Sequence, residues 1–180
     1  MACSSLITLV KNCGSEGLIA GVQKLYMVSA NDLISVSGST GASYSVDTNG
    51  IVNAIGLGAE KKFVEIGIIK NTTGLNEEFT INENGTNYST ETLTLKLADI
   101  TVENKKFVDS VRGQEVAVIV KSRTGKFYTV GLNGLMKLSA LSGGLGLAEG
   151  DDIGYNLTFS GVSQSGIQLV DVATVATSIA

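Results

Sequence analysis

The stretch STETLTLKLADI (89–100) has the clearest alternation of apolar and polar side chains in the chain. Successive side chains of a β-strand point to opposite sides, so the two sets occupy opposite faces. The apolar set consists of Leu93, Leu95 and Leu97. The polar set consists of Thr90, Thr92, Thr94 and Lys96. This pattern predicts a strand with one face packed in a core and the other face in water.

Other alternating or apolar runs, separated by turn residues, predict further strands and a mainly β, antiparallel fold. They lie at 22–29, 51–56, 61–70, 115–134 and 153–161. Residues 115–134 predict a hairpin with Gly125 in its turn. In its first strand Val116, Val118 and Val120 share one face, and Ala117 and Ile119 share the other. We therefore expect this strand to be buried on both sides.

The period changes in DITVENKKFVDSVRG (99–113), where apolar residues recur at roughly helical spacing. Asp99 or Thr101 is a suitable N-cap, and Gly113 is a suitable C-terminal glycine. The segment predicts one short α-helix at about 101–112 and little other helix.

Three segments lack a clear pattern of strand or helix. Residues 30–50 are rich in Ser, Gly, Asn and Thr, and residues 71–88 are polar, with Asn84-Gly85 as a hairpin tip. Residues 165–180 carry no charge after Asp171, which is typical of an arm that docks on something else. The first is either a mobile loop or an arm that gains order from a partner, and the third is interpreted as a C-terminal arm.

A chain of 180 residues, 43% of them hydrophobic, is expected to form a single domain over 1–180. The formal net charge is −4, from 13 basic and 17 acidic side chains, with no basic block. Binding to a nucleic-acid backbone relies on clustered Lys and Arg, so sequence-specific nucleic-acid binding is disfavoured. An acidic wall that DNA passes without adhering is compatible with this charge.

Cys3 and Cys13 lie near the first residue, where no basic segment precedes the short apolar run. A secretory signal is therefore disfavoured, and we expect the two thiols to be free or buried. The chain contains no His, which excludes a His-containing zinc site, and two thiols alone fall short of four ligands.

Candidate catalytic and cofactor motifs are weak. GGLGLAEG (143–150) and GLG (56–58) superficially resemble phosphate-binding loops, but neither opens a predicted helix. Glu149, Asp151 and Asp152 lack the ligand spacing of an EF-hand. Without His, no Ser-His or Cys-His pair is available. We expect no enzyme activity, no cofactor and no metal.

Several stretches in order resemble one family of proteins. They are the MAC…C start, GTNYSTETLTLKL, the predicted helix, VAVIVKSRTGKFYTVGLNGL, and the glycine-aspartate turn into GYNLTFSG. Together they resemble virion proteins from phages of Bacteroidetes-type bacteria, and among these the tail tube subunits. The resemblance covers roughly residues 60–162 and the first 25. Residues 30–58 depart from it by being longer and richer in Gly and Ser.

Tail tube proteins are β-sandwiches flanked by one helix, and they stack as hexameric rings around a DNA channel. The resemblance implies an antiparallel sandwich or barrel, self-association, contact with other tail or connector proteins, and passing DNA without sequence-specific binding. Self-association of this kind needs segments that cross to neighbours, for which 30–50 and 71–88 are candidate inter-subunit loops and 165–180 is a candidate C-terminal arm. It also implies location in the virion after assembly in the bacterial host cytoplasm, without a membrane. The predicted channel-facing residues are Thr90, Thr92, Thr94 and Lys96. The predicted sandwich core comprises Leu93, Leu95, Leu97, Val116, Val118 and Val120.

Two other classes of function remain open. A head-tail connector, collar or tail terminator ring would share much of the tube fold. A capsid decoration or carbohydrate-binding β-sandwich usually exposes aromatic side chains, which is disfavoured because Trp is absent and most Phe and Tyr lie in strand patterns.

Overall fold

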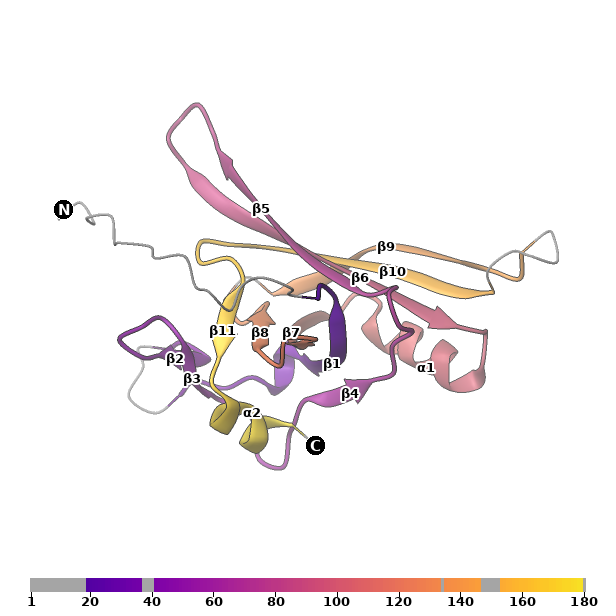
Figure 1. The fold of residues 1–180 in the computed structure, drawn as a ribbon, viewed down its shortest axis with the longest axis horizontal. Coiled ribbons are helices and arrows are strands. Elements are labelled where there is room, and N and C mark those ends of the chain that lie inside the picture. Colours follow the sequence, from indigo (N-terminus) through magenta and orange to yellow (C-terminus); the bar gives the residue numbers. More distant parts are fainter. Residues whose placement is uncertain (1–18, 37–40, 134, 147–152, 180) are drawn as a thin grey trace.

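The computed structural model describes residues 19–36, 41–133, 135–146 and 153–179. Within these residues the chain is mainly β, with 11 strands in one open, mostly antiparallel sheet and two short α-helices. The predicted mainly β fold is confirmed, although the sheet is continuous and does not close into a barrel (Figure 1). Cys3, Cys13 and the acidic turn with Glu149 lie outside the described residues.

The strands follow one another across the sheet in the order β2-β3-β11-β8-β7-β9-β10-β6-β5, with β1 beside β7 and β4 beside β1. Among the described strands, β3 and β11 form a parallel pair and the other pairs are antiparallel. The strands are β1 Val22–Ser29, β2 Tyr44–Val46, β3 Val52–Ile55, β4 Val64–Ile66, β5 Gly74–Ile81, β6 Asn87–Ala98, β7 Glu115–Ser122, β8 Phe127–Val130, β9 Met136–Gly144, β10 Gly154–Ser163 and β11 Gln168–Val170. The helices are α1 Val102–Val111 and α2 Val172–Ser178.

Strands β1 and β7 lie between two hydrophobic cores, and their side chains alternate between them. The main core contains Leu25, Met27, Leu93, Leu95, Leu97, Val108, Val111, Val116, Val118, Val120, Val130, Met136, Leu157 and Phe159. The second core contains Tyr26, Val28, Val52, Phe63, Ala117, Ile119, Leu132, Val170 and Val175. The predicted burial of β7 on both faces is confirmed, and it explains why this strand is a continuous apolar run.

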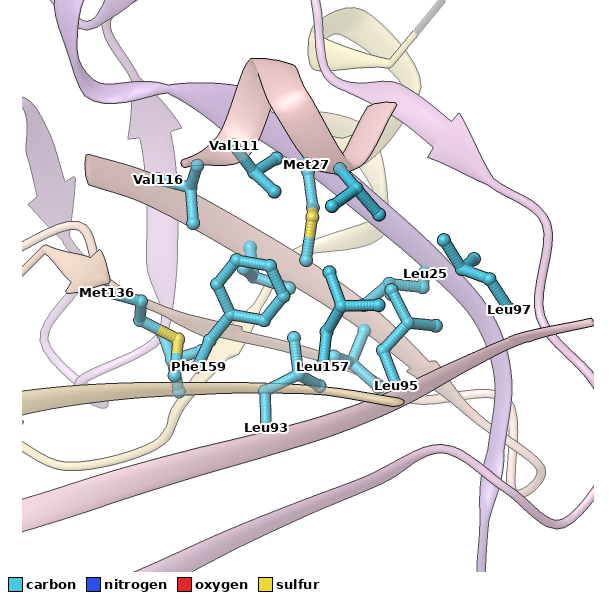
Figure 2. Packing of buried hydrophobic residues seen from close by; sticks show 14 residues of the cluster. Leu25, Met27, Leu93, Leu95, Leu97, Val111, Val116, Met136, Leu157 and Phe159 are labelled. Atoms are coloured by element: carbon cyan, nitrogen blue, oxygen red, sulfur yellow. The ribbon is translucent and has the colours of Figure 1, made fainter. Parts of the chain in front are cut away.

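The sheet bends so that its two parts face each other across the main core. Figure 2 shows Leu93, Leu95 and Leu157 pointing from β6 and β10 toward Met27 of β1. Strand β9 joins the two parts, because it pairs with strands of both. It pairs with β10 over most of its length, and with β7 through the pairs Val116–Met136 and Glu115–Lys137. Strands β9, β10, β6 and β5 therefore have one face on the core and one face outside.

Helix α1 begins and ends close to the predicted limits. The Thr101 hydroxyl accepts a hydrogen bond from the Asn104 N–H at 3.1 Å, so Thr101 is the N-cap. Gly113 follows the helix with a φ of +71°, as a C-terminal glycine does. Val108 and Val111 are buried in the main core, so the helix closes one end of it.

The predicted C-terminal arm, 165–180, packs against its own chain over its described part. Val170 of β11 and Val175 of α2 lie in the second core, and the Phe63 N–H donates to the Ser178 carbonyl at 2.8 Å. Helix α2 corrects the prediction of a single helix. Its Val and Thr residues have low helix propensity, so burial against the second core decides its conformation. Contact of this segment with another subunit stays a prediction.

The polar segment 71–88 is largely a strand rather than a loop. It contains β5, which pairs with β6 from Gly74–Thr94 to Ile81–Asn87. The tip is a turn in which the Asn82 N–H donates to the Thr86 carbonyl at 2.9 Å, and Gly85 has a φ of +82°. The hairpin extends away from the body of the molecule (Figure 1). Within 30–50 the structure describes a 3-10 turn, Ala30–Asp32, and β2.

Candidate functional surface: the polar face of the sheet

The outer face of β9, β10, β6 and β5 is composed mainly of hydroxyl and amide side chains. Strand register decides which residues share it, because directly paired residues point to the same side. In Figure 1 these four strands lie along the upper side of the molecule, with both helices below them. We call this surface the polar face. It comprises Asn76, Glu78, Thr90, Thr92, Thr94, Lys96, Lys137, Ala140, Ser142, Asn156, Thr158, Ser160 and Val162.

The four residues predicted to face a channel all lie on the polar face, in β6 at the middle of the four strands. Thr94 is exposed, whereas Thr90, Thr92 and Lys96 are half-buried because side chains of the flanking strands cover part of them. The six predicted core residues lie on the opposite side, and all are buried in the main core. The structure therefore separates the two predicted sets, while the presence of a channel stays a prediction.

Rows of short polar side chains run across the polar face. Thr92 lies between Asn76 of β5 and Ser160 of β10, and Thr94 lies beside Thr158. Such cross-strand pairs of hydroxyl and amide groups stabilise a sheet while leaving a surface that water wets. Bulky apolar groups are scarce here, although Val162 is 53% exposed. The surface is therefore mainly polar and wetted by water.

Charge on the polar face is sparse and of both signs. Its ionised side chains are Glu78, Lys96 and Lys137. The Lys137 ammonium is 2.7 Å from a carboxylate oxygen of Glu115, which offsets part of its charge. A face with so little uncompensated positive charge offers few ionic contacts to phosphate groups.

Two glutamates face the core side of the sheet where the β5–β6 hairpin leaves it. Glu77 and Glu91 are directly paired across β5 and β6, and Glu91 is 2% exposed. The Ser163 hydroxyl donates to Glu91 Oε1, and the Ser89 hydroxyl donates to Glu77 Oε1 at 2.7 Å. We call Glu77, Ser89, Glu91 and Ser163 the root cluster.

The root cluster also fixes the connection between β10 and β11. The Gly166 N–H donates to Ser163 Oγ at 2.9 Å, and the Ile167 N–H donates to Glu77 Oε2 at 2.9 Å. Both glutamates thus use hydroxyl and amide donors in place of cations. Since like charges on paired positions repel, this arrangement costs stability when both are ionised.

Burial raises the pKa of the Glu91 carboxyl above its ordinary value, and the nearby Glu77 charge adds to the rise. The hydrogen bonds from Ser163 and from the Glu91 N–H oppose it. The folded chain therefore holds the Glu91 proton more tightly than the unfolded chain does. The contribution of this protonation to the free energy of unfolding is fully present below pH 4.5, the ordinary pKa of a Glu carboxyl. It is lost as pH rises through the raised folded pKa.

We expect Glu91→Gln to stabilise the fold at pH 7 by on the order of 1 kcal/mol. The amide oxygen still accepts from Ser163, while the buried charge and its repulsion of Glu77 are removed. The measurement is urea denaturation at pH 7 and pH 4. The gain should shrink at pH 4, and a variant that is less stable than the wild type at pH 7 would contradict this account of Glu91.

The root cluster was not predicted from the sequence. The signal was present, because Glu91 is in phase with Leu93, Leu95 and Leu97, which places a carboxylate on the core face of a strand. Its partners Glu77 and Ser163 are 14 and 72 residues away in the chain and come together only through strand pairing.

The described residues contain no cluster of metal ligands and no helix that could span a membrane. No group of three or more Cys, Asp or Glu side chains in the described ranges is arranged to hold a metal ion. In the same ranges, no helix combines the length and apolar character needed to cross a bilayer.

Comparisons of this chain with protein-family models, with curated proteins and with solved structures find no match.

Proposed function

We propose that this protein is a structural subunit of a phage virion that assembles with copies of itself into rings, and that the rings stack into a tail tube around the DNA channel. The observation that carries the proposal is the polar face, a surface of four strands rich in Thr, Ser and Asn. The ordered resemblance to tail tube subunits supports it independently. The subunit acts by assembly, without catalysis or cofactor.

The polar face has the properties that a DNA channel wall needs. It is wetted and carries few ionised groups, so it would not hold phosphates as a surface of clustered Lys and Arg does. In the ring, Thr90, Thr92, Thr94 and Lys96 face the channel. The net charge of −4 also disfavours adhesion of the passing DNA.

The packing of the chain supports the tail-tube fold in outline. Two parts of the bent sheet enclose the main core as the two layers of a sandwich do, and α1 covers one end of it. Helix α2 goes beyond the one-helix arrangement of the family, and it covers the second core.

The strand order also leaves surfaces for ring contacts. Strands β5 and β2 stand at its two ends, and the backbone groups on the outer side of an end strand are open to pairing. Closed rings require contacts between two different surfaces of the subunit, repeated around an axis. We assign these contacts to the segments 30–50, 71–88 and 165–180, and expect the subunit to assemble in the bacterial cytoplasm and to remain in the virion.

Negative-stain electron microscopy of the purified protein, at low and high concentration, tests the proposal. Stacked rings with an open channel are the expected result at high concentration. Isolated rings that do not stack would instead favour a head-tail connector, collar or terminator. Particles of monomer size under all conditions, including in the presence of the other tail proteins of the same phage, would contradict self-assembly.

A further inference from the structure

The tip of the β5–β6 hairpin exposes two large apolar side chains. Strand β10 accompanies β6 as far as the Ser163–Ser89 pair, and beyond it β5 and β6 pair alone up to Ile81–Asn87. Phe79, which pairs with Ser89 where β10 ends, is 57% exposed, and Ile81, beyond that point, is 69% exposed. They are two residues apart on one strand and so share a face. Neighbouring exposed apolar side chains of this size are a feature of protein interaction sites.

The outer part of the hairpin is also acidic. Residues 71–95 contain Glu77, Glu78, Glu83 and Glu91, and no Lys or Arg. Glu83 is exposed in the turn at the tip, and Glu78 is exposed on the polar face, opposite the side that carries Phe79 and Ile81. The projecting surface therefore combines an apolar patch with negative charge.

An open groove on the body has the opposite character. Its volume is about 400 Å³. It is lined by Ile19, Val22, Gln23, Ile68, Lys70 and Arg123. We call it the basic groove, because its apolar side chains are flanked by Lys70 and Arg123. The turn that carries Arg123 adds Lys121 and Lys126, and residues 119–127 contain no acidic side chain.

Arg123 is held in place before any partner arrives. Its side-chain Nη2 donates to Asn71 Oδ1 at 2.5 Å, and its backbone N–H donates to the Gly21 carbonyl at 3.1 Å. A cation that is already ordered loses little conformational entropy on binding, which favours specific recognition of an acidic partner. Lys70 is exposed and forms no ion pair with another described residue that would compete with such a partner.

We propose that the tip of the β5–β6 hairpin of one copy docks in the basic groove of a second copy. Phe79 and Ile81 cover the apolar floor at Ile19, Val22 and Ile68, while the acidic tip lies near Lys70 and Arg123. The inference rests on the proposed self-assembly and not on a role in a phage tail.

The geometry excludes the same contact within one chain. Gly74, the first residue of β5, and Val22 line a common pocket, so the hairpin starts beside the basic groove. From there β5 extends through Ile81, and seven steps of about 3.3 Å place the tip roughly 20–25 Å away. The tip and the groove are different surfaces, so their contact can repeat around a ring or along a filament, or be made twice in a reciprocal dimer.

Charge reversal tests the contact. Lys70→Glu and Glu83→Lys change exposed side chains and are expected to leave the circular dichroism spectrum unchanged. Each should raise the protein concentration at half-assembly by about tenfold in sedimentation velocity. The two variants combined in one chain, or the two single variants mixed, should recover most of the loss. Lys106→Glu and Glu103→Lys on α1 make the same charge changes elsewhere and are the matched controls.

A cross-linking experiment supplies the geometry. Glu83→Cys and Lys70→Cys are introduced into separate chains of different mass, both with Cys3→Ser and Cys13→Ser. Oxidation of the mixture should yield the mixed dimer, whereas Lys106→Cys in place of Lys70→Cys should not.

The outcomes separate this inference from the proposed function. Charge rescue and the mixed dimer without rings or tubes would support the contact and contradict the tail tube. Rings or tubes that form unchanged from both charge-reversed variants would contradict the contact and leave the tube standing. If both variants assemble normally but fail to bind another tail protein, the groove takes that protein and the inference is wrong.

Discussion

Leu95→Asp is expected to abolish folding. Leu95 is 2% exposed and lies in the main core with Leu93, Leu157 and Phe159. A carboxylate at this position has no cation or donor to pair with, and burying it costs several kcal/mol, roughly the whole stability of a domain. The protein should be recovered as aggregate, and any soluble fraction should lack the β-sheet circular dichroism spectrum.

Two further variants make the result interpretable. Thr94→Asp changes the neighbouring residue, which is exposed on the polar face, and should alter the free energy of unfolding by no more than about 0.5 kcal/mol. Leu95→Ala should fold with a loss of about 2–5 kcal/mol in urea denaturation. A soluble and folded Leu95→Asp protein would show that the two faces of β6 are assigned the wrong way round.

Gly154→Ala is expected to lower the free energy of unfolding by about 2–4 kcal/mol. Gly154 opens β10 with a φ of +133°, a conformation that residues with a Cβ atom rarely adopt. A Cβ atom there would lie 2.0 Å from the Leu97 carbonyl oxygen and 2.9 Å from the Asp99 nitrogen, both of which are backbone atoms. Relief requires β6 and β10 to move apart at this end.

The matched control for this variant is Gly144→Ala. Gly144 pairs with Gly154 across β9 and β10, but a Cβ atom on it meets only the Gly146 nitrogen, at 3.9 Å. Thermal and urea denaturation should therefore separate the two variants, with Gly144→Ala close to the wild type. Equal losses in both would mean that the strain at Gly154 is absent.

The elements that could be predicted from the sequence are those whose pattern depends on local periodicity. The alternation at 92–97 gave β6 its two faces, and Thr101 and Gly113 marked the ends of α1. The two-sided burial of β7 followed from an uninterrupted apolar run. In each case one short stretch carries both the propensity and the burial pattern, so no distant residue is needed to interpret it.

The elements that could not be predicted depend on tertiary contacts. Strand β5 has a polar sequence because it stands at the end of the sheet and projects beyond it, where no apolar face is required. Helix α2 is short and rich in Val and Thr, and it is helical because the second core buries Val175.

The candidate surfaces divide in the same way. The β6 residues of the polar face were predicted because they lie on one strand, whereas the contribution of β5, β9 and β10 required the register. The basic groove joins Val22, Ile68 and Arg123, three positions separated by about 50 residues each, and no sequence pattern connects them.

Cryo-electron microscopy of the assembled wild-type protein tests the central claim, that the polar face lines a channel. The predicted reconstruction has subunits in rings with β6 along the inner wall and Thr90, Thr92, Thr94 and Lys96 facing the lumen. An assembly in which these four residues lie on its outer surface, or are buried between subunits, would contradict the account.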